Sequence, residues 1–230
     1  MGCQSNNATA PSPAIAPGAE VIDAPAVARA HSIDPRIPAA VPGFDAPFFQ
    51  AGLAGYSDAA MRLIARRHGA PCCVTEALLD RTVLANGRGF SKADLGELHD
   101  NVPGAHDDHP LVGQLMGADP DTMAAAAIKM LEQGKRPARF YRELAEGRAA
   151  LDTAPSPSDE TFQAIDVNLA CPVKKIERKA RGGHWLREPE GAIDILRAVR
   201  DAVPAHIPTT LKIRRGSDDS DTAERNFYRI

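Results

Sequence analysis

The stretch Ala164-Ile-Asp-Val-Asn-Leu-Ala-Cys-Pro172 decides the fold and points to the site. It begins as an apolar run suited to a buried strand and ends on an amide, a thiol and a proline. In parallel α/β folds, the carboxyl ends of the strands form the rim at which ligands bind. We therefore predict that Asn168 and Cys171 stand at the rim of a parallel sheet, where their side chains are available for chemistry.

Strand and helix patterns alternate on both sides of this stretch. Apolar runs predict strands, and apolar residues at helical spacing predict helices. The expected strands are 47–51, 72–76, 110–116 and 209–213, and the expected helices are 57–69, 78–87, 119–134, 189–203 and 222–230. This alternation is typical of a parallel sheet with right-handed crossovers. The predicted fold class is α/β, the N-terminal part of a TIM (β/α)8 barrel with about five strand-helix units of the eight that close it. On that count we expect the sequence to be cut short.

Two segments depart from the alternation. Residues 1–43 are rich in Ala, Pro, Ser and Asn and are predicted to be a disordered tail, followed by the incomplete barrel at 44–230. Residues at about 135–161 are predicted to be an insertion on the strand-helix frame. A solvated helix is the default interpretation of this insertion, and its mix of basic and aromatic residues offers RNA contact as the alternative.

Composition limits the classes of partner. The 230 residues are 43% hydrophobic with a net charge of −3, so no basic field covers the whole protein and a DNA partner is not expected. No apolar run approaches the ~20 residues of a membrane span. The four cysteines lack the spacing of a zinc or redox motif, which favours a reducing, cytoplasmic compartment. His99, His106 and His109 lie in a polar stretch that we interpret as a solvated loop, and no metal site is predicted.

Several polar residues in apolar strands are candidates for function. Gln114 lies in a buried strand and needs a partner, which a ligand would supply. Lys212 is either a strand-end side chain that reaches outward or a functional cation held inside. Glu76 is either a helix-capping carboxylate or a site residue. Cys72 and Cys73 are interpreted as small core residues.

Four segments in order resemble the tRNA-dihydrouridine synthase family. Asp166-Val-Asn-Leu-Ala-Cys-Pro-Val-Lys-Lys175 is similar to its D-x-N-x-G-C-P-x-x-K segment, and Ala51-Gly-Leu-Ala-Gly-Tyr-Ser-Asp58 is similar to its A-P-M-A-G-x-T-D segment. The segments Val112–Gly117 and Leu211–Arg214 fall on the corresponding strands. The resemblance covers about residues 46–230. Glycine replaces the family's usual proline at Gly52, and alanine replaces its glycine at Ala170.

The resemblance implies an enzyme that binds FMN at the top of a TIM barrel. Such enzymes use NADPH to reduce a tRNA uridine to 5,6-dihydrouridine. It implies that Cys171 supplies the proton and Asn168 holds the uracil edge. Gly52, Leu53, Gln114 and Lys212 match positions that contact the flavin. For Lys212 this suits a buried cation.

A basic run follows the cysteine and includes Lys174, Lys175 and Arg178. It is either a solvated loop or a contact for tRNA phosphates. Two alternative functions stay open: another FMN-dependent pyrimidine oxidoreductase, and an inactive barrel fragment that associates with another protein. Hydrolysis by Cys171 is disfavoured, because His184 is the only histidine nearby in sequence and no acyl-transfer motif accompanies it.

Overall fold

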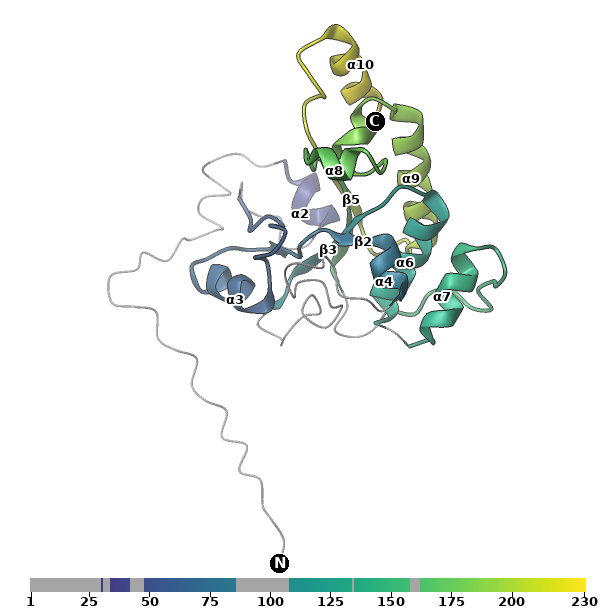
Figure 1. Ribbon diagram of the computed structural model, residues 1–230. Coiled ribbons are helices and arrows are strands. Elements are labelled where there is room, and N and C mark those ends of the chain that lie inside the picture. Colours follow the sequence, from purple (N-terminus) through teal and green to yellow (C-terminus); the bar gives the residue numbers. More distant parts are fainter. Residues whose placement is uncertain (1–29, 31–33, 42–47, 86–107, 134, 158–161) are drawn as a thin grey trace, which may run out of the picture.

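The centre of the protein is a curled parallel sheet with helices on its outer face (Figure 1). The computed structural model describes residues 30, 34–41, 48–85, 108–133, 135–157 and 162–230. The strands follow the order β1-β3-β4-β5 and comprise β1 (Cys73–Val74), β3 (Leu111–Met116), β4 (Ala164–Leu169) and β5 (Thr209–Ile213). Every pairing is parallel, and Gln50 bridges Cys73 in parallel at the first edge. The predicted fold class, part of a TIM barrel, is confirmed.

One side of β3 is paired by a strand that is interrupted in its middle. β1 faces Leu111 and Val112, and the short strand β2 (Leu78–Leu79) faces Leu115 and Met116. The segment 75–77 therefore stands opposite only two residues of β3, which is the geometry of a β-bulge. Residues 78 and 79 are strand, so the helix expected at 78–87 begins later, as α4 (Asp80–Ala85).

The strands alternate between two faces, as a half-barrel requires. Leu111 and Leu115 of β3 point outward into the main core, where α4, α6 (Pro120–Glu132) and α9 (Pro189–Ala202) cover the sheet (Figure 1). Val112 points inward and packs with Val41, Cys72, Val74 and Ala164 at the bottom of the barrel interior. Cys72 and Cys73 are fully buried, as predicted.

The helix α3 (Ala59–Arg67) on the N-terminal side is held by specific contacts. The side chain of Asp58 caps α3 by accepting from the N–H of Met61 at 2.8 Å. Arg62 of α3 is fully buried and pairs with Asp108, with Nη2 to Oδ2 at 2.8 Å. The short helix α2 (Arg36–Ala40) lies within the segment predicted to be a disordered tail, so that prediction is wrong for these residues. Residues 1–29 lie outside the described residues.

The helix in the predicted insertion is α7 (Ala138–Ala145), the outermost helix beside α6 in Figure 1. It is not simply solvated, because Tyr141 is completely buried in the main core. Tyr141 donates from its hydroxyl to Glu132 of α6 at 2.7 Å and accepts from the N–H of Arg136 at 3.2 Å. Burial and the Glu132 carboxylate raise the pKa of Tyr141.

The chain after β4 forms a compact return loop. It contains α8 (Lys174–Glu177) and the 3-10 helix η2 (Gly182–Leu186), and α10 (Asp221–Arg229) follows β5. Among the described residues no helix is long and apolar enough to cross a membrane.

Candidate active site

The inner face of the sheet becomes polar toward its carboxyl end. Above the apolar layer around Val112, the strand register places Gln114 beside Asp166, Asp166 beside Thr210, and Asn168 beside Lys212. Gln114, Asp166 and Asn168 are all buried, with 8% exposure or less. These polar residues lie up to about 100 positions apart in the sequence. The alternation of side chains along each strand brings them together on the inner face.

Hydrogen bonds join these side chains into one chain. Thr210 donates to Oδ1 of Asp166 at 2.6 Å, and Nε2 of Gln114 donates to its Oδ2 at 2.7 Å. Nδ2 of Asn168 donates to Oε1 of Gln114 at 2.7 Å. Finally, Oδ1 of Asn168 accepts from the backbone N–H of Ala170 at 3.1 Å and of Cys171 at 3.0 Å.

Cys171 follows β4 directly and is half-buried. Its side chain packs beside Ala77, Met116 and Ile176, an apolar setting. The carbonyl of Cys171 accepts from the N–H of Gly183 at 2.9 Å, so the return loop folds back onto the cysteine.

Glycine is required where the return loop meets Cys171. Gly182 has a φ of +56°, which is left-handed, and a Cβ there would lie 2.8 Å from Cβ of Cys171. The loop is held from behind by the ion pair of Arg181 with the buried Asp80, with Nη2 to Oδ1 at 3.5 Å. The indole of Trp185 also donates to the carbonyl of Gly117 at 3.2 Å.

The segment containing Gly52 and Leu53 forms the opposite wall. A Cβ at Gly52 would lie 2.3 Å from the carbonyl oxygen of Thr75 and 3.4 Å from Oε1 of Gln114. The small residue is therefore needed already for contact with the bulge after β1. Leu53 donates its N–H to Oγ of Ser57 at 2.6 Å, and its side chain is exposed.

Glu76, in the bulge, fixes the same wall. Its carboxylate is buried and accepts from the N–H of Gly55 at 2.9 Å. The residue therefore orients the loop at 52–56, a role different from the helix cap considered from the sequence.

A cleft opens between these walls. One hollow of about 200 Å³ is lined by Gly52, Ala54, Ala77, Gln114, Met116, Asn168, Ala170, Cys171, Pro172 and Lys212. A second hollow of about 140 Å³ lies deeper along the same face and shares Gly52, Gln114 and Lys212 with the first. Every residue predicted for catalysis, substrate and flavin lines the cleft except Leu53, which adjoins Gly52.

Lys212 differs from the buried cation that suited the predicted role. It is exposed on β5, with its strand neighbour Leu211 also 37% exposed. Its charge still acts on the site. Burial raises the pKa of Asp166, and the hydrogen bonds from Thr210 and Gln114 and the charge of Lys212 oppose that rise.

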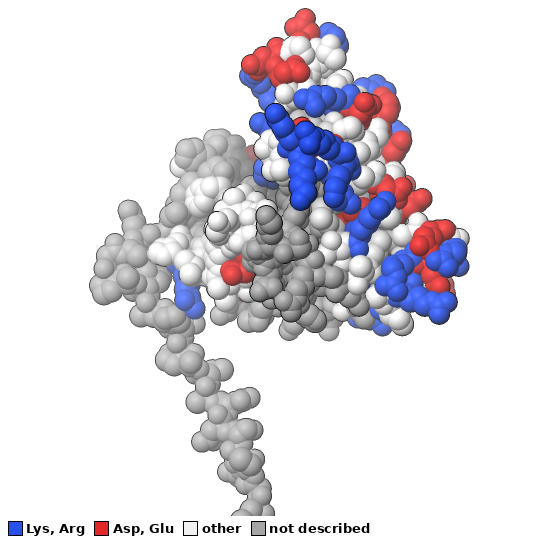
Figure 2. Space-filling view, viewed as in Figure 1, with Lys and Arg blue, Asp and Glu red and all other residues white. Residues whose placement is uncertain are grey.

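The predicted RNA-contact residues lie next to the cysteine. Lys174, Lys175 and Arg178 are all exposed in and after α8. Figure 2 shows lysine and arginine gathered over the position of α8 in Figure 1. The local basic surface that the sequence predicted is therefore present beside the cleft.

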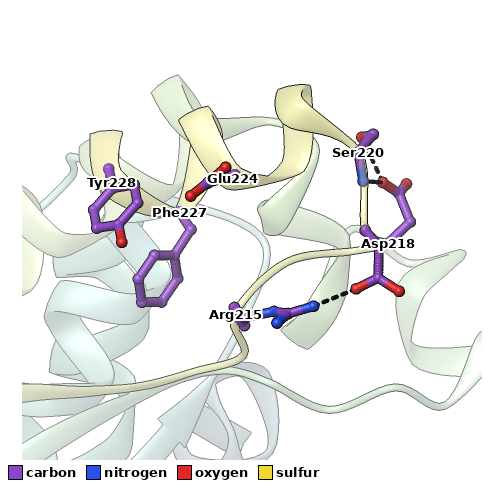
Figure 3. A pocket seen from close by; sticks show the side chains of 7 residues that line it. Arg215, Asp218, Ser220, Glu224, Phe227 and Tyr228 are labelled. Atoms are coloured by element: carbon purple, nitrogen blue, oxygen red, sulfur yellow. Dashed lines mark hydrogen bonds and ion pairs between the residues drawn. The ribbon is translucent and has the colours of Figure 1, made fainter.

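A separate hollow lies between α10 and the loop that precedes it. Arg215, Asp218, Ser220, Glu224, Phe227 and Tyr228 line it, as Figure 3 shows. Its polar groups are largely satisfied within the loop. Ser220 donates to Asp218 at 2.5 Å, accepts from the N–H of Ala223 at 3.2 Å and caps the helix. None of the predicted site residues lines this hollow.

Metal-ligating side chains do not cluster in the part of the chain that the structure describes. His99 and His106 lie outside the described residues. His109 is described, and its Nδ1 lies 3.0 Å from Oε1 of Gln163.

Sequence reasoning assigned no role to Asp166 and Thr210. Asp166 belongs to the motif, and it shares with Asn168 the spacing of two that places side chains on one face of a strand. An acidic residue within a strand that is otherwise buried was the available signal. Thr210 carried no comparable signal, because threonine is common in strands.

The fold and the cleft define a class: part of a parallel α/β barrel with an amide- and thiol-lined site at the carboxyl ends of its strands. A family model described as dihydrouridine synthase matches residues 145–230. The chain is 32% identical over 180 residues to tRNA-dihydrouridine synthase B of Pseudomonas putida. The aligned region covers 78% of this chain and 42% of that protein. It is 33% identical to tRNA-dihydrouridine synthase B of Pseudomonas aeruginosa, over 73% of this chain and 40% of that protein. A tRNA-dihydrouridine(16) synthase of Vibrio cholerae is 33% identical over 112 residues.

The chain belongs to the dihydrouridine synthase family. It spans less than half the length of the curated relatives named above.

Proposed function

We propose that this chain carries the uridine-reducing site of a tRNA-dihydrouridine synthase. One observation carries the proposal. Gly52, Gln114, Asn168, Cys171 and Lys212 come from four separate segments and line one cleft at the carboxyl ends of the strands. The named relatives support tRNA uridine as the substrate over a free pyrimidine.

The cleft suits a flat ring that carries carbonyl groups, as FMN does. Each primary amide has two N–H groups. Gln114 and Asn168 each use one in the hydrogen bonds that the described residues make with one another. The remaining N–H groups and the exposed ammonium of Lys212 offer donors to ring carbonyls, while Met116 supplies an apolar floor. Gly52 and Leu53 would lie along one edge of the ring.

When bound, FMN supplies the hydride, and NADPH restores its reduced form. The role of this chain's residues is to hold the uridine and move the proton. Cys171 stands beside the cleft on a turn fixed by Asn168 and by Gly183, so its Sγ can donate a proton to C5 of a uracil placed there. The ammonium group of Lys212 would stabilise negative charge on the pyrimidine part of a bound flavin.

The basic surface at α8 would hold the tRNA backbone. Lys174, Lys175 and Arg178 are exposed and follow Cys171 by only a few residues, so they lie close to where the target base must enter. Contacts of this kind make affinity fall with salt in proportion to the number of phosphates neutralised. A cytoplasmic location is proposed together with this tRNA substrate. The barrel is proposed to occupy residues 44–230, with 135–161 as an insertion on it.

The decisive experiment compares the native chain with Cys171→Ala. Unmodified tRNA is incubated with each protein, FMN and NADPH, and dihydrouridine is measured. Because the proton donor is removed, we expect the variant to lose about 100-fold or more in rate. A matched control, Cys72→Ala, alters a buried thiol outside the cleft and should retain activity if folded.

Equal rates for the native chain and Cys171→Ala would disprove the role of the thiol. Reduction of free uracil or orotate with no reduction of tRNA would instead favour another FMN-dependent pyrimidine oxidoreductase. A folded chain that retains no bound flavin after incubation with FMN and removal of the free FMN would favour an inactive barrel fragment.

A further inference from the structure

The hydrogen-bond chain on the inner face has a single direction. From the N–H of Cys171 to Asn168, from Asn168 to Gln114 and from Gln114 to Asp166, every donor points toward the Asp166 carboxyl group. Thr210 donates to the other oxygen of the same group.

This direction matters because a primary amide can rotate by half a turn and exchange its donor and acceptor ends at little steric cost. If Asn168 turned over, its NH2 group would face the N–H groups of Ala170 and Cys171, and donor would oppose donor. Asn168 is kept in place by Oε1 of Gln114, which must therefore point toward it. Gln114 is in turn held at its far end by the acceptor that Asp166 provides.

We infer that Asp166 is a positioning residue that sets the orientation of both amides and thereby fixes the turn that presents Cys171. The inference rests on the proposed function for its catalytic consequence, but not for its structural content. The side-chain hydrogen bonds of Asp166 run to Gln114 and Thr210 rather than to the thiol or the return loop. It acts through Gln114 and Asn168, and its 6% exposure keeps water from substituting as the acceptor.

Amide hydrogen exchange in the full chain tests this without any cofactor. In the native protein the N–H of Cys171 should be protected by its bond to Asn168. Asp166→Asn places an amide at the end of the chain, which can face Gln114 with either its donor or its acceptor. We expect the Cys171 amide to exchange about five to ten times faster, as loss of an ordinary hydrogen bond implies. The Ile165 amide, bonded to the carbonyl of Pro208 at 3.0 Å, should be unchanged and reports the integrity of β4.

Two further variants distinguish an effect of hydrogen-bond direction from a general disruption of the site. Thr210→Val removes one donor to Asp166 but leaves the acceptor for Gln114, so the Cys171 amide should change by less than about twofold. The double variant Asp166→Asn with Gln114→Glu exchanges the two functional groups. The new carboxylate accepts from both neighbours, Asn168 again faces correctly, and protection of Cys171 should return to within about twofold of native.

The inference is overturned if Asp166→Asn leaves Cys171 exchange unchanged, or if the double variant folds without regaining protection. It is also overturned if the Cys171 amide of the native chain exchanges as fast as in an unstructured peptide. Should Asp166→Asn alone fail to fold, the double variant decides by the same criterion, and the native measurement decides if both fail. In the tRNA assay, Asp166→Asn should lower kcat with little change in KM. A native chain without activity would count against the proposed function, while the exchange data would still decide the role of Asp166.

Discussion

Gly182→Ala tests whether the return loop packs so closely against Cys171 that only glycine fits at position 182. Gly182 has a φ of +56°, and an alanine methyl group there would lie 2.8 Å from Cβ of Cys171 and 3.0 Å from its carbonyl oxygen. Left-handed backbone costs an alanine about 1–2 kcal/mol, partly offset by about 0.4–1 kcal/mol from a less flexible unfolded chain. Overlap in a packed site adds about 1–3 kcal/mol. We therefore expect the free energy of unfolding to fall by about 2–4 kcal/mol.

Gly147→Ala is the matched control. Gly147 has a similar φ of +68°, but nothing lies within 4 Å of the position that an alanine methyl group would take. It should carry the backbone cost alone, about 0.5–1 kcal/mol. Urea unfolding followed by circular dichroism measures both variants. Alkylation in a Cys3→Ser background reports on Cys171, which should react several-fold faster in Gly182→Ala than in Gly147→Ala. Equal losses of stability and equal alkylation rates for Gly182→Ala and Gly147→Ala would refute the close packing of the loop against Cys171.

Three other substitutions test separate parts of the fold. Arg62→Met leaves the buried Asp108 carboxylate without its guanidinium and should cost about 3–5 kcal/mol in urea unfolding, and a loss below about 1 kcal/mol would contradict a structural role for the pair. Ala180→Gly relieves a φ of +52° in the return loop and should stabilise the chain by about 0.5–1 kcal/mol, whereas a destabilised variant would argue against that backbone conformation. Burial lowers the pKa of Lys129 to about 8 from 10.5, so the native chain should gain stability as pH rises from about 8 to 10.5, because the unfolded state then binds more protons. Lys129→Met should lack that gain of about 3 kcal/mol, and parallel pH profiles for the two proteins would disprove it.

The sequence predicted the frame well because its signals were local. Apolar runs bounded by turn residues located four of the strands, and Asp119-Pro120 marked the start of α6, where Asp119 indeed accepts from the N–H of Thr122 at 2.9 Å. The strand-end rule then placed Asn168 and Cys171 at the rim of the sheet.

The features that the sequence did not predict depend on contacts between residues far apart in the chain. The partners of Gln114 lie 52 and 54 residues away, and only the pairing of β3 with β4 shows that Asp166 and Asn168 occupy both ends of its amide. The bulge after β1 is likewise set by its register against β3. It explains why Glu76 turns to hold Gly55 rather than capping a helix. Lys212 is exposed because β5 is the last strand in the order of the sheet. The apolar residues on either side of Lys212 had suggested that it would be buried.

The geometry of Asn168 narrows the way in which it can recognise a base. The family resemblance implies that Asn168 holds a uracil edge, and a primary amide can in general both donate and accept. Its oxygen, however, already accepts from Ala170 and Cys171, and one N–H is directed to Gln114. Among the described residues the second N–H makes no recorded hydrogen bond. Under the proposed function this N–H can donate to a uracil carbonyl, whereas the amide oxygen offers little to the ring N3–H. Under the proposed function, Asn168 both presents the thiol and contacts the base, so a change that moves one of these contacts also disturbs the other. If the proposed function holds, discrimination for uridine acts through an N–H of Asn168, and the Asp166 carboxyl group sets the position of that N–H through Gln114.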